Sequence, residues 1–76
     1  MSMTLHDMEI LQRAHDDAVA EANSAAVAIA ELVAEGHRPG KEDIDRYRVA
    51  RLGVESTRRD LEYCMQIELH ELNMKF

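Results

Sequence analysis

The chain has 76 residues, a formal net charge of −6 and one cysteine, Cys64. This length allows one domain at most, over residues 1–76, with a core that supplies little stability by itself. A single cysteine excludes an internal disulfide and suits a reducing compartment, and a transmembrane helix would need about 18 or more nearly uncharged apolar residues in a row. The sequence has no such run, and its N-terminus lacks the basic start of a signal peptide, so we expect a cytoplasmic protein that does not contact a membrane.

The first predicted element is a helix over about residues 5–35, with Thr4 as its N-cap and Asp7 completing a capping-box arrangement. Its apolar positions recur at steps of three and four, as amphipathic helices require; they are Leu5, Met8, Leu11, His15, Ala18, Ala22, Ala25, Ile29 and Leu32. Nine of the 21 residues from 14 to 34 are alanine. Alanine favours helix and leaves a thin surface, so a second helix can approach closely.

The second element is a turn over residues 36–40, Gly36-His37-Arg38-Pro39-Gly40. It contains the only proline and two of the three glycines of the chain. Helices tend to end at glycine, and proline cannot continue a helix with its hydrogen bonds intact. The sequence therefore predicts an all-α fold, an antiparallel two-helix hairpin.

The third element is a helix over about residues 41–73. Glu42, Asp43 and Asp45 fall in its first turns, where the positive end of the helix dipole favours acidic side chains. Its expected inner stripe is Ile44, Tyr47, Ala50, Val54, Thr57, Leu61, Cys64 or Met65, and Leu72.

A hairpin centred on residues 38–39 would pair residues whose numbers add up to about 77. Gly53 would then lie opposite Ser24 and Ala25, which predicts a very close crossing, either within the hairpin or at the seam of a dimer. The first half of the chain is acidic, with seven acids and one base in residues 1–36, whereas residues 37–76 hold eight of each. The expected ion pairs join Arg46 to Glu31, and Arg58 and Arg59 to Asp16, Asp17 and Glu21.

The C-terminal third of the chain carries apolar residues on more than one helix face. Leu61, Met65 and Leu72 can face the first helix, whereas a second stripe cannot be covered by the same partner. An exposed apolar patch on a small protein marks an interface, either with a second copy or with another protein. The candidate interface residues are Tyr63, Ile67, His70, Met74 and Phe76, together with Gly53.

No arrangement of residues typical of catalysis is present. The chain has no glycine-rich phosphate loop and no recognisable nucleophile system, so we expect no enzymatic activity, no catalytic residues, no cofactor and no small-molecule substrate. The predicted pairing brings His6 near His70, with Asp7, Glu9 and Glu71 close by. A zinc site there is an alternative, but surface or interface histidines are the preferred interpretation, with no metal bound.

Five arginines lie within fourteen residues of the second helix: Arg46, Arg48, Arg51, Arg58 and Arg59. Such a cluster can bind phosphates, so a nucleic-acid-binding bundle is an alternative function. The net negative charge, the interleaved acids and the scarcity of aromatic residues make pairing within or between protein subunits the preferred interpretation. A structural subunit of a larger assembly is a further alternative.

The layout resembles the small type III secretion needle co-chaperones, which are acidic helical hairpins with a Gly-x-x-Pro turn, here Gly36 to Pro39, and an apolar face that holds a partner. It is equally similar to small phage-encoded inhibitors and anti-activators, which dock helices onto host proteins. Both resemblances imply a non-enzymatic module that masks or inhibits a partner protein. We expect a homodimer, built as a four-helix bundle. The partner, and the choice between chaperone and inhibitor, remain open.

Overall fold

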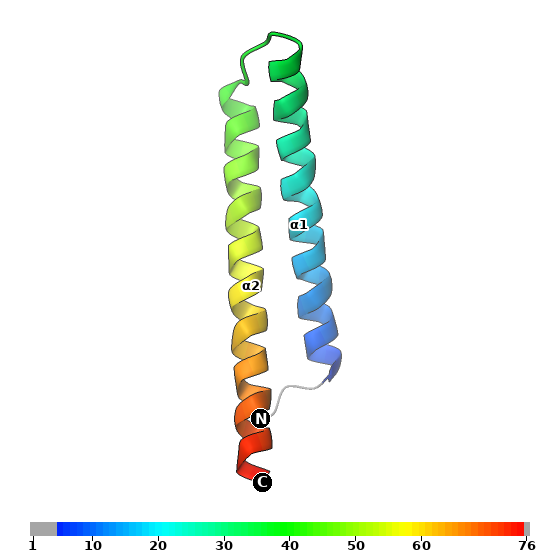
Figure 1. Ribbon diagram of the computed structural model, residues 1–76, viewed down its shortest axis with the longest axis vertical. Coiled ribbons are helices and arrows are strands. Elements are labelled where there is room, and N and C mark those ends of the chain that lie inside the picture. The colour runs from blue at the N-terminus through cyan, green and yellow to red at the C-terminus, as the bar shows by residue number, and fades with distance from the viewer. Residues whose placement is uncertain (1–4, 76) are drawn as a thin grey trace.

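The computed structural model describes residues 5–75, which form two α-helices, α1 (Leu5–Ala34) and α2 (Lys41–Lys75). The helices run antiparallel and lie side by side (Figure 1). The predicted all-α hairpin is thus confirmed. α1 ends one residue before the expected end, and α2 continues two residues beyond it. Thr4 and Phe76 lie outside the described residues.

α1 ends in a hydrogen-bonded motif that needs glycine. The N–H of His37 donates to the carbonyl of Leu32 at 2.8 Å, and the N–H of Gly36 donates to that of Val33 at 3.0 Å. Together these two bonds form a Schellman motif, which satisfies carbonyls that the helix end leaves unpaired. Gly36 has a φ of 82°, a conformation that other residues rarely adopt. This explains why the helix stops here.

α2 begins with a cap supplied by its own first turn. The N–H of Gly40 donates to Oδ2 of Asp43 at 3.0 Å, and the N–H of Ile44 donates to the carbonyl of Gly40 at 3.2 Å. Gly40 is therefore the N-cap, and Asp43 takes the reciprocal position of a capping box. The carboxylate also lies at the positive end of the helix dipole, as the sequence predicted.

The alignment of the two helices differs from the predicted one. His15 contacts Thr57, and Ala18 lies against Gly53, so facing residue numbers add up to 72 and 71. Gly53 therefore does not lie opposite Ser24 and Ala25, and that prediction was wrong. The reason is an asymmetric turn: the chain rises over the end of α1 and then descends further, so α2 starts below the end of α1 in Figure 1. At the other end α2 extends beyond α1.

Gly53 is not required for the approach of the helices. A Cβ built at this position would lie 3.9 Å from Cβ of Ala18, an ordinary van der Waals contact. An alanine would therefore fit within the hairpin at Gly53. The narrow seam owes its closeness to the alanines of both helices instead.

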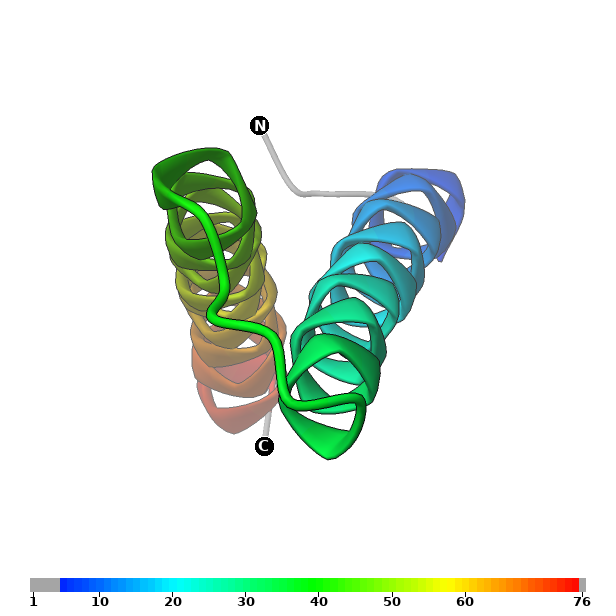
Figure 2. The ribbon, with the colours of Figure 1, turned by 90° about the horizontal axis from the view of Figure 1, so that it is seen from above.

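The core is small and made of small side chains. Among the described residues, the buried apolar ones are Ala22, Ala25, Ala50 and Cys64. The hairpin is a single layer two helices wide (Figure 2), with dimensions of 60 × 17 × 15 Å. Its radius of gyration is 17.4 Å, against about 11 Å for a compact globule of this length. Its accessible surface is 6226 Å², against about 4,700 Å² for a folded monomer of this mass.

Candidate protein-binding surfaces

One polar contact crosses the seam between the helices. Nδ1 of His15 lies 2.8 Å from Oγ1 of Thr57, and that hydroxyl lies 2.9 Å from the carbonyl of Gly53 and 3.1 Å from that of Val54. The single hydroxyl proton goes to a carbonyl of its own helix, so the assigned arrangement has His15 donating from Nδ1. His15 and Thr57 are both half-buried. The pair is therefore a structural contact that favours this alignment of the helices, because a shift would take the Thr57 acceptor away from the half-buried His15.

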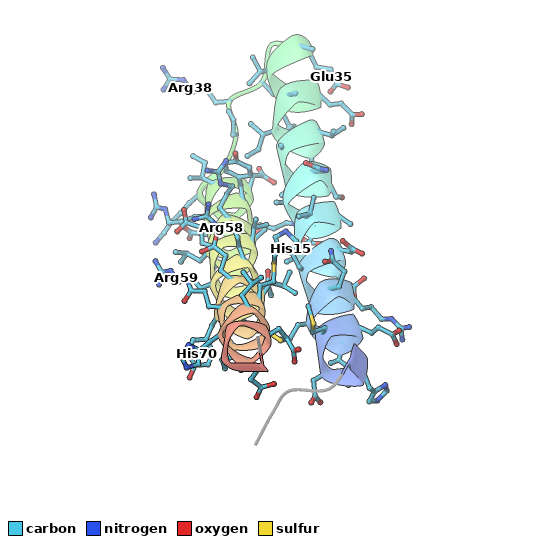
Figure 3. The ribbon with its side chains drawn as sticks, turned by 60° about the horizontal axis from the view of Figure 1, so that its bottom comes forward. His15, Glu35, Arg38, Arg58, Arg59 and His70 are labelled. Atoms are coloured by element: carbon cyan, nitrogen blue, oxygen red, sulfur yellow. The ribbon has the colours of Figure 1, made fainter. Side chains whose placement is uncertain are left out.

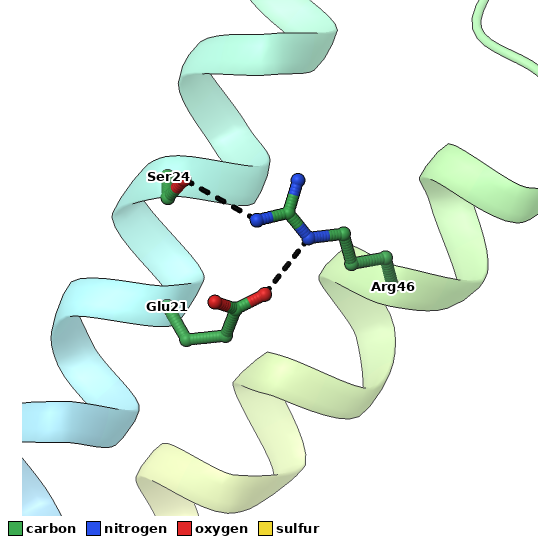
Figure 4. A network of polar contacts seen from close by, with 3 residues as sticks. All are labelled: Glu21, Ser24 and Arg46. Carbon is green, nitrogen blue, oxygen red and sulfur yellow. Dashed lines mark hydrogen bonds and ion pairs between the residues drawn. The ribbon is translucent and has the colours of Figure 1, made fainter.

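A second polar contact joins the helices at the surface (Figure 4). Nε of Arg46 donates to Oε1 of Glu21 at 2.8 Å, and Nη2 donates to Oγ of Ser24 at 3.3 Å. The pKa of the Glu21 carboxyl is lowered, mainly by the hydrogen bond from Arg46 and to a smaller extent by the positive charge of Arg46. The predicted pair of Arg46 with Glu31 was wrong, because the helices are shifted relative to the predicted alignment.

The predicted ion pairs of Arg58 and Arg59 with α1 are not formed among the described residues. Nε of Arg58 lies 4.0 Å from Oε1 of Glu62, one turn along α2. Arg59 lies on the side of α2 away from α1 (Figure 3). The shifted alignment is again the reason.

Three of the five clustered arginines interact within the hairpin. Besides Arg46 and Arg58, Arg51 donates to the hydroxyl of Tyr47 at 3.3 Å, and its guanidinium carbon lies 5.9 Å from the centre of the Tyr47 ring. Arg51 and Arg58 line one hollow between the helices, Arg46 lines another, and Arg59 lies on the side of α2 away from α1 (Figure 3). The arginines that are clustered in the sequence are therefore spread over more than one side of α2.

The described residues offer no constellation for metal chemistry. No three His, Cys, Asp or Glu side chains in residues 5–75 come close enough together to hold a metal ion. The zinc alternative at His6 and His70 consequently has no set of donors there. Neither described helix is long and apolar enough to cross a bilayer.

The sequence predicted that either Cys64 or Met65 belongs to the inner stripe of the second helix, and the structure shows that it is Cys64. The Cys64 side chain is completely buried, whereas Met65 is 52% exposed. Burial raises the pKa of the Cys64 thiol, and the carboxylates of Glu68 and Asp7 raise it further. At neutral pH the thiol is protonated and inaccessible, which makes it a packing group and a poor nucleophile.

The raised pKa of Cys64 predicts that the chain loses stability in alkaline solution. The unfolded chain releases the thiol proton above about pH 8.5, while the folded chain holds it to higher pH. The contribution of the protonated Cys64 thiol to the stability of the fold is therefore fully present below the pKa of the unfolded thiol. It is lost as pH rises through the pKa of the folded thiol. Urea unfolding from pH 7 to 10 should show a steeper decline for the wild type than for Cys64→Ala. Parallel declines would contradict the assignment.

An apolar groove runs along one broad side of the hairpin. One hollow of about 310 Å³ lies between Val19 and Ala26 of α1 and Val54 of α2. A second, also of about 310 Å³, lies between Met8 of α1 and the α2 residues Leu61 and Met65. The lining residues of each helix recur at helical intervals of four, seven and eleven, so both hollows lie on the same side. We call this side the groove face; its apolar residues are Met8, Val19, Ala26, Val54, Leu61 and Met65.

A separate apolar ridge lies on α2, on a different side from the groove face, and Val49 at its start also lines a hollow with Glu21 of α1. Val49, Leu52 and Tyr63 are 67%, 61% and 62% exposed, and they are spaced by three and eleven residues. We call these three residues the outer ridge. Tyr63 was predicted from the sequence; Val49 and Leu52 were missed, although their helical spacing from Tyr63 was available as a signal.

The other predicted interface residues fall in different surroundings. His70 is exposed and lies on the side of α2 away from α1 (Figure 3), whereas Ile67 is half-buried. Gly53 is half-buried against α1. The side chain of Met74 and the whole of Phe76 lie outside the described residues. Tyr63 and His70 therefore lie on an open surface, whereas Ile67 is only partly accessible.

Comparison with known proteins gives no family for this chain. No protein-family model matches it, and neither does any curated protein or solved structure. The resemblance to secretion co-chaperones and phage inhibitors thus rests on the hairpin and the turn from Gly36 to Pro39. Functional inference rests on the surfaces described above.

Proposed function

We propose that this chain is a non-enzymatic binding module, which masks or inhibits a partner protein by packing an apolar helical surface against it. The observation that carries the proposal is the outer ridge, where three large side chains stay exposed on a hairpin whose core is mostly alanine. Burying one such side chain is worth about 1.5–3 kcal/mol. A partner that covers the ridge therefore gains affinity without any rearrangement of the hairpin.

The shape and chemistry of the outer ridge define the kind of partner. From Val49 to Tyr63 the ridge spans about 21 Å along α2, at 1.5 Å per residue. Arg59, one turn before Tyr63, lies beside it. A single helical ridge of this kind fits an apolar groove on a partner protein. A carboxylate of that partner would pair with Arg59. Tyr63 is the expected anchor, because tyrosines are enriched among residues that dominate binding energy.

Site-specific photo-crosslinking tests this function. A benzophenone amino acid at Tyr63, incorporated in the native host, should yield one covalent adduct with a different protein. The same probe at Ala20, which is exposed on α1, should not. Tyr63→Asp and Leu52→Asp should then weaken binding of the purified partner about thirtyfold or more, as expected for loss of a central contact.

Ala20→Asp is the matched control, because it adds the same charge away from the outer ridge. Circular dichroism should show unchanged helix content for all three variants. Equal partner affinity for the wild type and both ridge variants would exclude the outer ridge as the binding surface.

A further inference from the structure

We propose that a second copy of this chain covers the groove face, with α2 packed antiparallel on α2 of the partner copy and a two-fold axis crossing between residues 56 and 57. The product is a four-helix bundle of two hairpins. This inference does not depend on the outer ridge, which the arrangement leaves on the outside of the bundle.

The first support is the amount of surface that a single hairpin leaves uncovered. The accessible surface of 6226 Å² exceeds that of a folded monomer of this mass by about 1,500 Å². A stable protein interface needs only about 800 Å² from each partner. The excess is therefore large enough for a permanent dimer, and the two hollows of the groove face offer a place for it.

The second support is a charge pattern along the α2 side of the groove that complements itself. Arg51, Glu55 and Arg58 line the groove, and Glu62 follows one turn later. Their signs alternate at intervals of four, three and four residues. Reversing the helix about the midpoint between residues 56 and 57 sets Arg51 opposite Glu62 and Glu55 opposite Arg58. Each pair then occurs twice, as an isologous interface requires.

The same reversal matches apolar residues at both ends of the pattern. Ile44 lies seven residues before Arg51, and Leu69 lies seven residues after Glu62, so both share the groove side of α2. They are 43% and 57% exposed in the single hairpin. The two-fold axis sets Ile44 of one copy against Leu69 of the other. Because the axis crosses near the middle of α2, which spans Lys41–Lys75, the two copies overlap along almost their whole length.

The existing contacts of these charged residues leave them able to re-pair. Arg58 and Glu62 are 4.0 Å apart, at the limit of an ion pair, and both are more than half exposed. Arg51 donates a hydrogen bond to the hydroxyl of Tyr47 and forms no ion pair among the described residues. Pairing across the dimer seam would therefore replace weak contacts within α2 by contacts between opposite charges.

Disulfide trapping tests the arrangement directly. In Ile44→Cys/Leu69→Cys the two introduced thiols are about 37 Å apart within one straight helix and cannot join. Mild oxidation should therefore produce a dimer linked between copies. Val49→Cys/Tyr63→Cys is the control, because its two positions are centred on residue 56, half a residue from the proposed axis, but lie on the outer ridge; it should stay unlinked. Oxidation of the wild type controls for Cys64, which is buried.

Charge reversal gives an independent measurement. Sedimentation equilibrium should return twice the 8.7 kDa chain mass for the wild type. Arg51→Glu should weaken dimerisation about tenfold, because like charges then face each other twice, and adding Glu62→Arg should restore affinity to within about threefold. A monomeric wild type at 100 µM overturns the proposal, and so does linkage of the ridge pair in place of the groove pair. Circular dichroism of each variant separates loss of dimer from loss of fold.

Discussion

Ala25→Leu should destabilise the hairpin more than any other substitution among its alanines. Ala25 is 1% exposed, which makes it the most buried alanine among the described residues. A leucine there must push the helices apart, at a cost of about 1–3 kcal/mol. A core of this size supplies only about 3–5 kcal/mol, so thermal unfolding followed by circular dichroism should show a much lower midpoint.

Ala20→Leu is the control for this substitution. Ala20 lies on the same helix but is exposed, and alanine and leucine differ little in helix propensity. Its unfolding midpoint should stay close to that of the wild type. If the two variants had equal midpoints, the narrow seam would not be the main constraint on the fold.

Cys64→Asp should unfold the chain. The Cys64 side chain is completely buried, and a carboxylate placed there would lose its hydration without gaining a partner of opposite charge. Asp7 and Glu68 already act on this position as negative charges, so the new carboxylate would also be repelled. The far-ultraviolet circular dichroism signal should fall to that of a largely disordered chain at neutral pH.

Tyr63→Asp provides a control at the adjacent residue. Tyr63 is on the outer ridge, and its new carboxylate would remain in water. This variant should keep its helix content while losing the partner, according to the proposed function. A folded Cys64→Asp chain would mean that α2 can rotate to expose residue 64, which would contradict the observed seam.

The two proposed interfaces use different sides of α2. The groove face buries the broad side of the hairpin against a second copy, and the outer ridge points away from it. A dimer would therefore present two outer ridges at once. Their separate tests, with cysteine pairs for one and photo-crosslinking for the other, distinguish failure of either proposal.

The sequence alone determined the two helices and the turn between them. Gly36, Gly40 and Asp43 act through hydrogen bonds that reach no further than five residues along the chain. Such local interactions are visible in the order of residues. The three- and four-residue steps of the apolar positions likewise identified the inward side of each helix, including Ala22, Ala25 and Ala50.

The tertiary structure alone decided how the helices are aligned. The conformation of residues 37–40 sets where α2 starts relative to α1, and no spacing in the sequence reports that conformation. The ion pairs predicted for Arg46, Arg58 and Arg59 failed for this reason. The periodicity also could not choose between Cys64 and Met65. Residues seven apart on a helix of 3.6 residues per turn are offset by about 20° around the helix axis, so the inward stripe moves from one position to the next along a long helix. Only packing against α1 placed Cys64 inside and left an outer ridge and a groove face on different sides of α2.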